Sequence, residues 1–207
     1  MNLLAIDRST DTQSVAVAKD GKVAGRVFAG MDSRSADWPG RVRDFLAANG
    51  LSVQDLDLIL VGLGPGSFAG IRAALAFAQG LALPAGKRVV GLPSTLALAR
   101  DGARTAVVGD ARRDRYWVVV YEGMQTVSDF SLVTKDALAG AVPEHCAVVT
   151  PDGARIESLL QGVFGHHYKG SLVPLAARLA EVALAHPNLA QPEPLPIYLQ
   201  PAVRPSA

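Results

Sequence analysis

Short apolar runs separated by polar turns open the chain, and they predict a three-stranded meander. Leu3 to Ile6 is a continuous apolar run, which is typical of a strand buried on both faces. Two further β-rich runs follow, Ser14 to Ala18 and Val23 to Phe28, with Asp20-Gly21 between them. Because that pair tolerates the positive φ of a tight turn, we expect a hairpin there.

Helical spacing comes next. Four apolar side chains recur at i, i+4, i+7 and i+8, which places them on one stripe of a helix: Trp38, Val42, Phe45 and Leu46. Asp37 is the expected N-cap, Pro39 lies in the first turn, and Asn49-Gly50 ends the helix. A strand is expected over Asp57 to Leu63.

The second predicted helix, Phe68 to Leu83, is unusually apolar, and Pro84 is expected to end it. Its only polar side chains are Arg72 and Gln79. Small residues let another helix come close, and they include Gly70, Ala73, Ala74, Ala76, Ala78 and Gly80. A helix that is apolar all round must be covered all round. It is therefore either a central core helix or a helix with one face open to a partner.

From Thr105 the pattern of the first residues begins again. The segment AVVGDARRDRYWVVVYEG repeats the layout of LLAIDRSTDTQSVAVAKDG, so that Asp7 corresponds to Asp110 and Gly21 to Gly123. Each segment is an apolar strand ending in aspartate, then a polar turn, a second strand and a glycine turn. We expect two similar α/β halves, residues 1–104 and 105–207, each a mixed sheet flanked by helices.

The second half is expected to contain a strand at Ala147 to Val149 and helices near Asp152 to Leu160 and Leu172 to Ala185. A short strand at Val89-Val90 and a helix from Ser94 to about Arg100 complete the first half. The proline-rich end, residues 191–207, should be extended and should pack on the body through four apolar side chains: Leu195, Ile197, Tyr198 and Leu199.

Composition narrows the class of protein. The chain has 207 residues, 49% of them hydrophobic, and a formal net charge of +1, without a long basic stretch. Phosphate contacts supply most of the affinity of nucleic-acid binders, so this balance disfavours direct tRNA binding by the chain alone. The single cysteine, Cys146, stands in an apolar run and is expected to be buried, which fits a reducing cytoplasm.

Metal and membrane sites are not expected. No two of the four histidines have the i, i+4 spacing that places two ligands on one helix face, and His166-His167-Tyr168 is interpreted as a surface turn. No apolar run approaches the roughly 20 residues of a membrane span. The sequence therefore predicts a cytoplasmic protein with no metal and no cofactor.

The doubled strand–aspartate–turn layout suggests the fold shared by actin, sugar kinases and Hsp70, in which two such turns hold a nucleotide's phosphates. That chemistry needs small residues, so that backbone N–H groups approach the phosphate. The turns here read DRST and DARR, without glycine. Asp7, Ser9 and Asp110 are thus interpreted as remnants of phosphate turns, where the carboxylates either bind Mg²⁺ through water or simply cap their turns.

The segment GPGSFAGIR resembles several motifs and matches none of them. No Gly-Lys-Ser/Thr follows its glycines, the third glycine position of a dinucleotide fingerprint holds Ala69, and Ser67 is not flanked by the glycines of a nucleophile elbow. A catalytic Ser67 would need a base, and the histidine nearest in sequence is His145. We expect a tight strand-to-helix turn with Ser67 as the cap.

With these pieces in place, the chain resembles the TsaB (YeaZ) family from end to end. The matching segments are LLAIDRST, VGLGPGSFAGIR, GDARRDRYW and PLPIYLQP. The resemblance implies an actin-like/Hsp70-like (ASKHA, ribonuclease H-like) α/β fold with a degenerate nucleotide site. It also implies a role in making threonylcarbamoyl-adenosine in tRNA, as a non-catalytic scaffold that binds and activates a TsaD-like transferase.

The resemblance further implies a TsaE-like ATPase in the assembled complex, tRNA contact only through that complex, and self-association of the isolated chain as a homodimer. The family's contact surface lies on the first two helices. Carried onto this chain, it comprises nine residues: Trp38, Val42, Phe45, Leu46, Phe68, Ile71, Arg72, Leu75 and Gln79. The alternative is a stand-alone enzyme of the same fold, either an ATP-dependent kinase or a glycoprotease-like peptidase.

Overall fold

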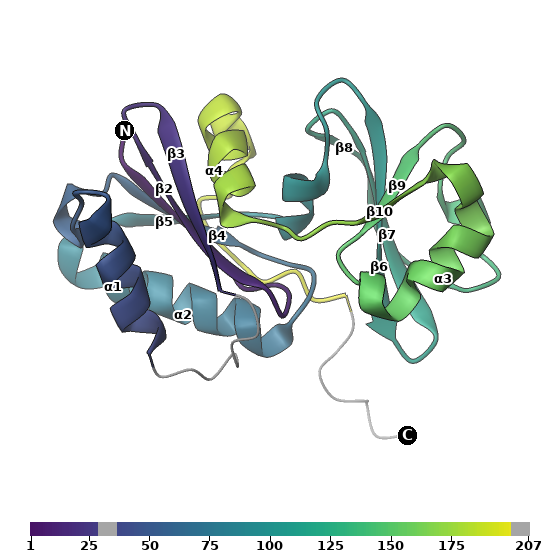
Figure 1. Ribbon diagram of the computed structural model, residues 1–207, viewed down its shortest axis with the longest axis horizontal. Helices are drawn as coiled ribbons and strands as arrows, with labels where there is room; N and C mark the ends of the chain where they lie inside the picture. The colour runs from purple at the N-terminus through teal and green to yellow at the C-terminus, as the bar shows by residue number, and fades with distance from the viewer. Residues whose placement is uncertain (29–36, 200–207) are drawn as a thin grey trace. The chain divides into compact units, whose positions relative to one another are not determined.

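The computed structural model describes residues 1–28 and 37–199, and the chain forms two compact units (Figure 1). The first unit comprises Met1–Ala97 together with Pro174–Ile197, and the second comprises Leu98–Val173 with Tyr198 and Leu199. The predicted division into 1–104 and 105–207 was therefore wrong in two respects. The first stretch ends at Ala97, and a late helical segment returns to the first unit because it packs on the first sheet.

The first unit is built on a five-stranded mixed sheet with the strand order β3-β2-β1-β4-β5. Its strands are β1 Leu3–Asp7, β2 Gln13–Lys19, β3 Lys22–Phe28, β4 Leu58–Gly62 and β5 Arg88–Leu92. β1 pairs antiparallel with β2 and parallel with β4. Asp20 and Gly21 have φ values of 53° and 75°, so the predicted hairpin between β2 and β3 is confirmed.

Helices cover both faces of this sheet (Figure 1). α1, Trp38–Ala48, and α2, Phe68–Ala85, lie on one face, and α4, Ala176–Ala185, lies on the other. β1 is completely buried because it is central in the sheet and covered on both sides, as its continuous apolar run predicts. The core on the α1/α2 side is mainly aliphatic, and its buried aromatic residues are Phe28, Trp38 and Phe45.

α2 differs from its sequence prediction at the end. Pro84 lies inside the last turn, and the helix ends at Ala85. The next residue, Gly86, has a φ of 62°, the left-handed conformation of a C-terminal cap. By length and composition α2 could cross a membrane, so the expectation that no segment of the chain reaches that length was wrong. In the first unit its side chains Ile71, Ala74 and Ala78 are completely buried against the sheet.

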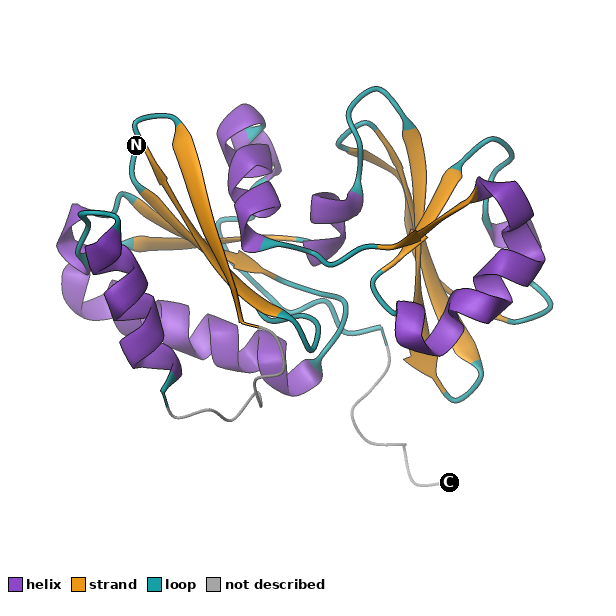
Figure 2. Ribbon diagram, in the orientation of Figure 1, coloured by secondary structure: helices purple, strands orange, loops and turns teal. Residues whose placement is uncertain are grey.

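The second unit repeats the topology of the first. Its sheet has the order β10-β9-β6-β7-β8, so that β6 to β10 take the places of β1 to β5. Figure 2 shows the strands in orange and the helices in purple. The strands are β6 Arg104–Arg112, β7 Arg115–Glu122, β8 Gln125–Thr134, β9 Ala147–Thr150 and β10 Tyr168–Ser171, with α3, Gly153–Phe164, on one face. The predicted duplication is confirmed, although β8 and β10 were not predicted from the sequence.

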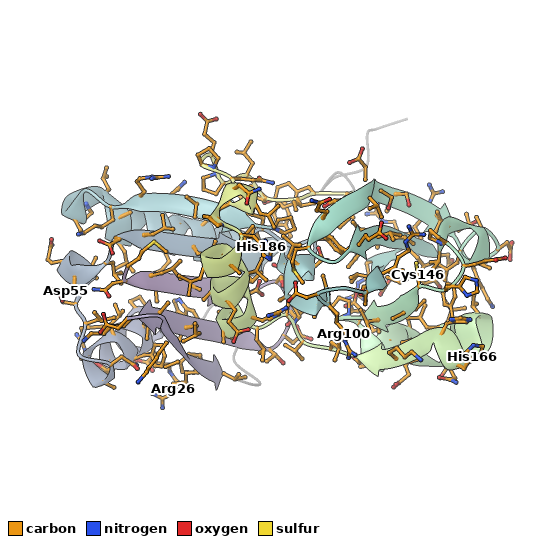
Figure 3. All side chains as sticks on the ribbon, turned by 90° about the horizontal axis from the view of Figure 1, so that it is seen from above. Arg26, Asp55, Arg100, Cys146, His166 and His186 are labelled. Atoms are coloured by element: carbon orange, nitrogen blue, oxygen red, sulfur yellow. The ribbon has the colours of Figure 1, made fainter. Side chains whose placement is uncertain are left out.

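Three smaller predictions concern the segment after β5, the single cysteine and the extended end. Ser94–Leu98 is a 3₁₀ turn rather than an α-helix. Cys146 is 2% exposed, as expected, and Figure 3 labels it. In the extended end, the Ile197 N–H donates to the Leu63 carbonyl over 2.9 Å, which confirms that contact, whereas Leu195 is 70% exposed and does not pack.

Candidate functional site

The turn after β1 is held by its own aspartate. The Asp7 carboxylate is completely buried, and its Oδ1 accepts hydrogen bonds from the Ser9 backbone N–H over 2.9 Å and from the Ser9 hydroxyl over 2.7 Å. Its Oδ2 accepts from the Ser94 hydroxyl over 2.5 Å, and Ser94 Oγ in turn accepts from the Gly64 N–H. Burial raises the pKa of Asp7, although these hydrogen bonds oppose the shift.

The GPGSFAG segment packs directly against this turn. The Ser67 N–H donates to the Ser9 carbonyl over 2.7 Å. A Cβ placed on Gly66 would lie 2.0 Å from the Ser9 carbonyl oxygen, and one on Gly70 would lie 2.1 Å from that of Arg8. These glycines therefore give the chain's own backbone room to approach. The space beside the motif is filled by the Asp7–Thr10 turn, which had been predicted to be the remnant of a phosphate turn.

Arg8 is buried between this turn and Trp38 of α1. Its side chain is almost completely buried, and its guanidinium carbon lies 4.5 Å from the centre of the Trp38 ring. Burial lowers the pKa of Arg8. Trp38 meets Phe28 edge to face, with 5.4 Å between the ring centres. A large arginine thus occupies a position where nucleotide chemistry would require a small residue.

The corresponding turn in the second unit is held by ion pairs. Asp110 Oδ1 accepts from the Arg112 backbone N–H over 2.7 Å, and its Oδ2 contacts the Arg155 Nε over 2.9 Å. The Asp110 backbone N–H donates to Asp152, which also pairs with Arg155. Burial raises the pKa of Asp152.

In both turns the aspartate therefore accepts from the backbone N–H two residues later, at Ser9 and at Arg112, which is the turn-capping role. One backbone N–H of each turn is therefore engaged within the chain. This arrangement favours the capping interpretation of Asp7, Ser9 and Asp110 over a phosphate or Mg²⁺ site. Among the described residues, no three histidine, cysteine, aspartate or glutamate side chains gather closely enough to hold a metal ion.

Ser67 is the N-cap of α2, as predicted. Its Oγ accepts a hydrogen bond from the Gly70 N–H over 3.1 Å. Replacing Ser67 with alanine is expected to lower the free energy of unfolding by about 1 kcal/mol, the usual value of such a cap. Urea unfolding of the wild type and of Ser67→Ala measures this loss, and an unchanged free energy of unfolding would contradict the capping role.

The predicted partner-binding residues divide into two groups. Six of the nine lie in the chain's own core, each 6% exposed or less: Trp38, Val42, Phe45, Leu46, Ile71 and Leu75. These six were wrongly predicted as surface residues, because the same apolar stripe that predicted an interface is the stripe that packs on the sheet. Only Phe68, Arg72 and Gln79 are exposed.

The exposed residues of α2 form one continuous face. Phe68 and Leu83, at its two ends, are 42% and 86% exposed. Between them the exposed positions recur at helical spacing, and we call the set the α2 face: Phe68, Ala69, Arg72, Ala76, Gln79, Gly80 and Leu83. Arg72 lies over the ring of Phe68, 5.1 Å from its centre. Leu83 was not predicted as a member of this face, although its place one helical step beyond the small residues could have indicated it.

Comparison with known proteins identifies the family. The family model described as TsaD, tRNA N6-adenosine threonylcarbamoyltransferase, matches residues 36–183. The TsaB protein of Escherichia coli is 35% identical over 124 residues, which cover 56% of this chain and 54% of that protein. An uncharacterised protein of Mycobacterium tuberculosis, Rv3421c, is 33% identical over 85% of this chain and 91% of its own length.

Solved structures agree with these sequence matches. The structure titled YeaZ from Pseudomonas aeruginosa superimposes with a TM-score of 0.77 and 25% identity, covering 95% of this chain and 100% of that one. The likeness extends over both units, each with its mixed sheet. The chain therefore belongs to the family that the TsaD model describes, in its TsaB (YeaZ) group.

Proposed function

We propose that this protein acts in the biosynthesis of threonylcarbamoyl-adenosine in tRNA, as a non-catalytic cytoplasmic subunit that binds and activates a TsaD-like transferase. Its membership of the TsaB group supports the pathway. The observation that carries the subunit role is the α2 face, an exposed helical surface whose only charged member is Arg72. The α2 face is the partner-binding surface in this proposal.

The chemistry of the α2 face suits helix packing. Alanine and glycine at its centre let a partner helix approach closely, and Phe68 and Leu83 offer large apolar side chains at the two ends. Apolar side chains that are desolvated on binding supply most of the energy of such an interface. The capped turns at Asp7 and Asp110 support the non-catalytic part of the proposal, since their polar groups are engaged within the chain.

Co-purification of this protein with the TsaD-like protein of the same organism, with mass read by light scattering, tests the proposal. Ala76→Glu places a charge at the centre of the α2 face and Leu83→Glu places one at its end, and neither change touches the core. Each is expected to weaken the complex about 100-fold or more, because binding would remove the new carboxylate from water. The measurement is a titration followed by fluorescence anisotropy, with tRNA modification assayed in parallel.

Val127→Glu is the matched control. Val127 lies on β8 in the second unit and is 49% exposed, so the same change from an apolar to an acidic side chain occurs away from α2. It is expected to leave both affinity and modification unchanged. A complex that forms equally well with Ala76→Glu and Leu83→Glu would exclude the α2 face as the binding surface.

A further inference from the structure

The hairpin between β6 and β7 carries an unusual concentration of positive charge at its tip. Residues 112–115 read Arg-Arg-Asp-Arg, and all four side chains are exposed. Arg112 lies 3.4 Å from the Asp110 carboxylate. Among the described residues, Arg113 and Arg115 have no side-chain ion pair. The balanced net charge of the whole chain conceals this local excess.

The backbone of this tip adopts a conformation that its side chains disfavour. Arg112, Arg113 and Asp114 have φ values of 65°, 56° and 56°, all in the left-handed region. Two-residue hairpin turns of this kind strongly prefer Asn-Gly or Asp-Gly, and a bulky arginine with positive φ is uncommon. The turn from β2 to β3 contains Gly21.

The strand register adds a second unfavourable feature. Arg112 on β6 and Arg115 on β7 are paired directly across the hairpin, and like charges in that position repel one another. Neither feature helps this unit to fold. Both of them place exposed guanidinium groups together on a short and defined hairpin. Unfavourable local conformation concentrated at one exposed position is typical of a functional site.

We propose that the tip of the β6–β7 hairpin contacts the phosphate backbone of tRNA through Arg113 and Arg115, when this protein is assembled with its transferase partner. Guanidinium groups present paired donors that match phosphate oxygens. Two such contacts are too few for tight binding by the isolated chain, which agrees with its nearly neutral charge. Within a complex they add to the partner's own contacts.

This inference rests on the proposed function, and the experiment separates the two. The assembled complex is titrated with an unmodified tRNA transcript at several salt concentrations. Arg113→Asn/Arg115→Gln is expected to weaken binding about tenfold, and to reduce the slope of log K against log salt by about 1.5, because two phosphate contacts are lost. Asparagine is chosen at position 113 because it tolerates a positive φ.

Lys22→Gln/Arg88→Gln is the matched control, since it removes two exposed positive charges from the first unit. It is expected to change the slope by less than the hairpin variant does. Equal slopes for the wild-type complex and the hairpin variant would overturn the inference while leaving the proposed function intact. Weakened assembly with the transferase, at unchanged tRNA affinity of the assembled complex, would also overturn it, because the tip would then contact protein. Failure of the wild-type protein to assemble would instead contradict the proposed function.

Discussion

Replacing Gly70 with alanine is expected to lower the free energy of unfolding by about 3 kcal/mol, whereas the same change at Gly80, ten residues later in the same helix, is expected to raise it by about 1 kcal/mol. A Cβ on Gly70 would lie 2.1 Å from the Arg8 carbonyl oxygen and 3.0 Å from Ser67 Oγ. Backbone atoms cannot give way cheaply, so α2 would have to move from the β1 turn. At Gly80 the added methyl group meets no atom within 4 Å.

Urea unfolding of the two variants beside the wild type measures this contrast, with circular dichroism as the signal. Because both substitutions replace glycine with a better helix former, their difference reports chiefly the contacts that the added methyl group makes at position 70. Equal effects of the two changes would contradict the close packing of the GPGSFAG segment against the Arg8–Ser9 turn. Gly80→Ala is used for stability only, since Gly80 belongs to the α2 face.

Removing the Asp7 side chain is expected to have an effect of similar size. In Asp7→Ala the Ser9 N–H and the hydroxyls of Ser9 and Ser94 lose their acceptor, and buried donors without acceptors are costly, so we expect a loss of about 3 kcal/mol at neutral pH. Asp7→Asn preserves the shape of the side chain and one carbonyl oxygen. Asp7→Asn should therefore lower the free energy of unfolding by less than Asp7→Ala does.

The pH dependence of Asp7→Asn tests the burial of the charge. Burial raises the folded-state pKa of Asp7 above its unfolded value. The stability linked to this raised pKa is fully present below the unfolded pKa and is lost as the pH rises through the folded pKa. The free energy of unfolding of the wild type is therefore expected to exceed that of Asp7→Asn most near pH 4, and by less at pH 8. Urea unfolding at both values measures it, and an advantage that grows with pH would show that the folded pKa is instead depressed.

Local sequence was sufficient to predict the elements whose signals are local. The Asp20-Gly21 hairpin, the start of α2 at Ser67 and the repeat of the strand–aspartate–turn layout all follow from neighbouring residues, because turn conformation and capping depend on the backbone nearby. The family resemblance rested on the same local motifs. β8 escaped prediction because it lies at the edge of its sheet and most of its residues are exposed, which leaves little apolar alternation to detect.

The sequence by itself determined the duplicated α/β architecture, the apolar stripe of α1 and the apolar character of α2. Only the tertiary structure decided which side of α2 is buried: Leu75 contributes to the core, whereas Ala76 and Leu83 belong to the α2 face. It also decided that α4 packs on the first sheet, and that the glycines of GPGSFAG receive the Arg8–Ser9 turn. The physical reason is the same in each case. Helical spacing fixes which side chains share a face, but the choice of the buried face depends on contacts between segments far apart in the chain.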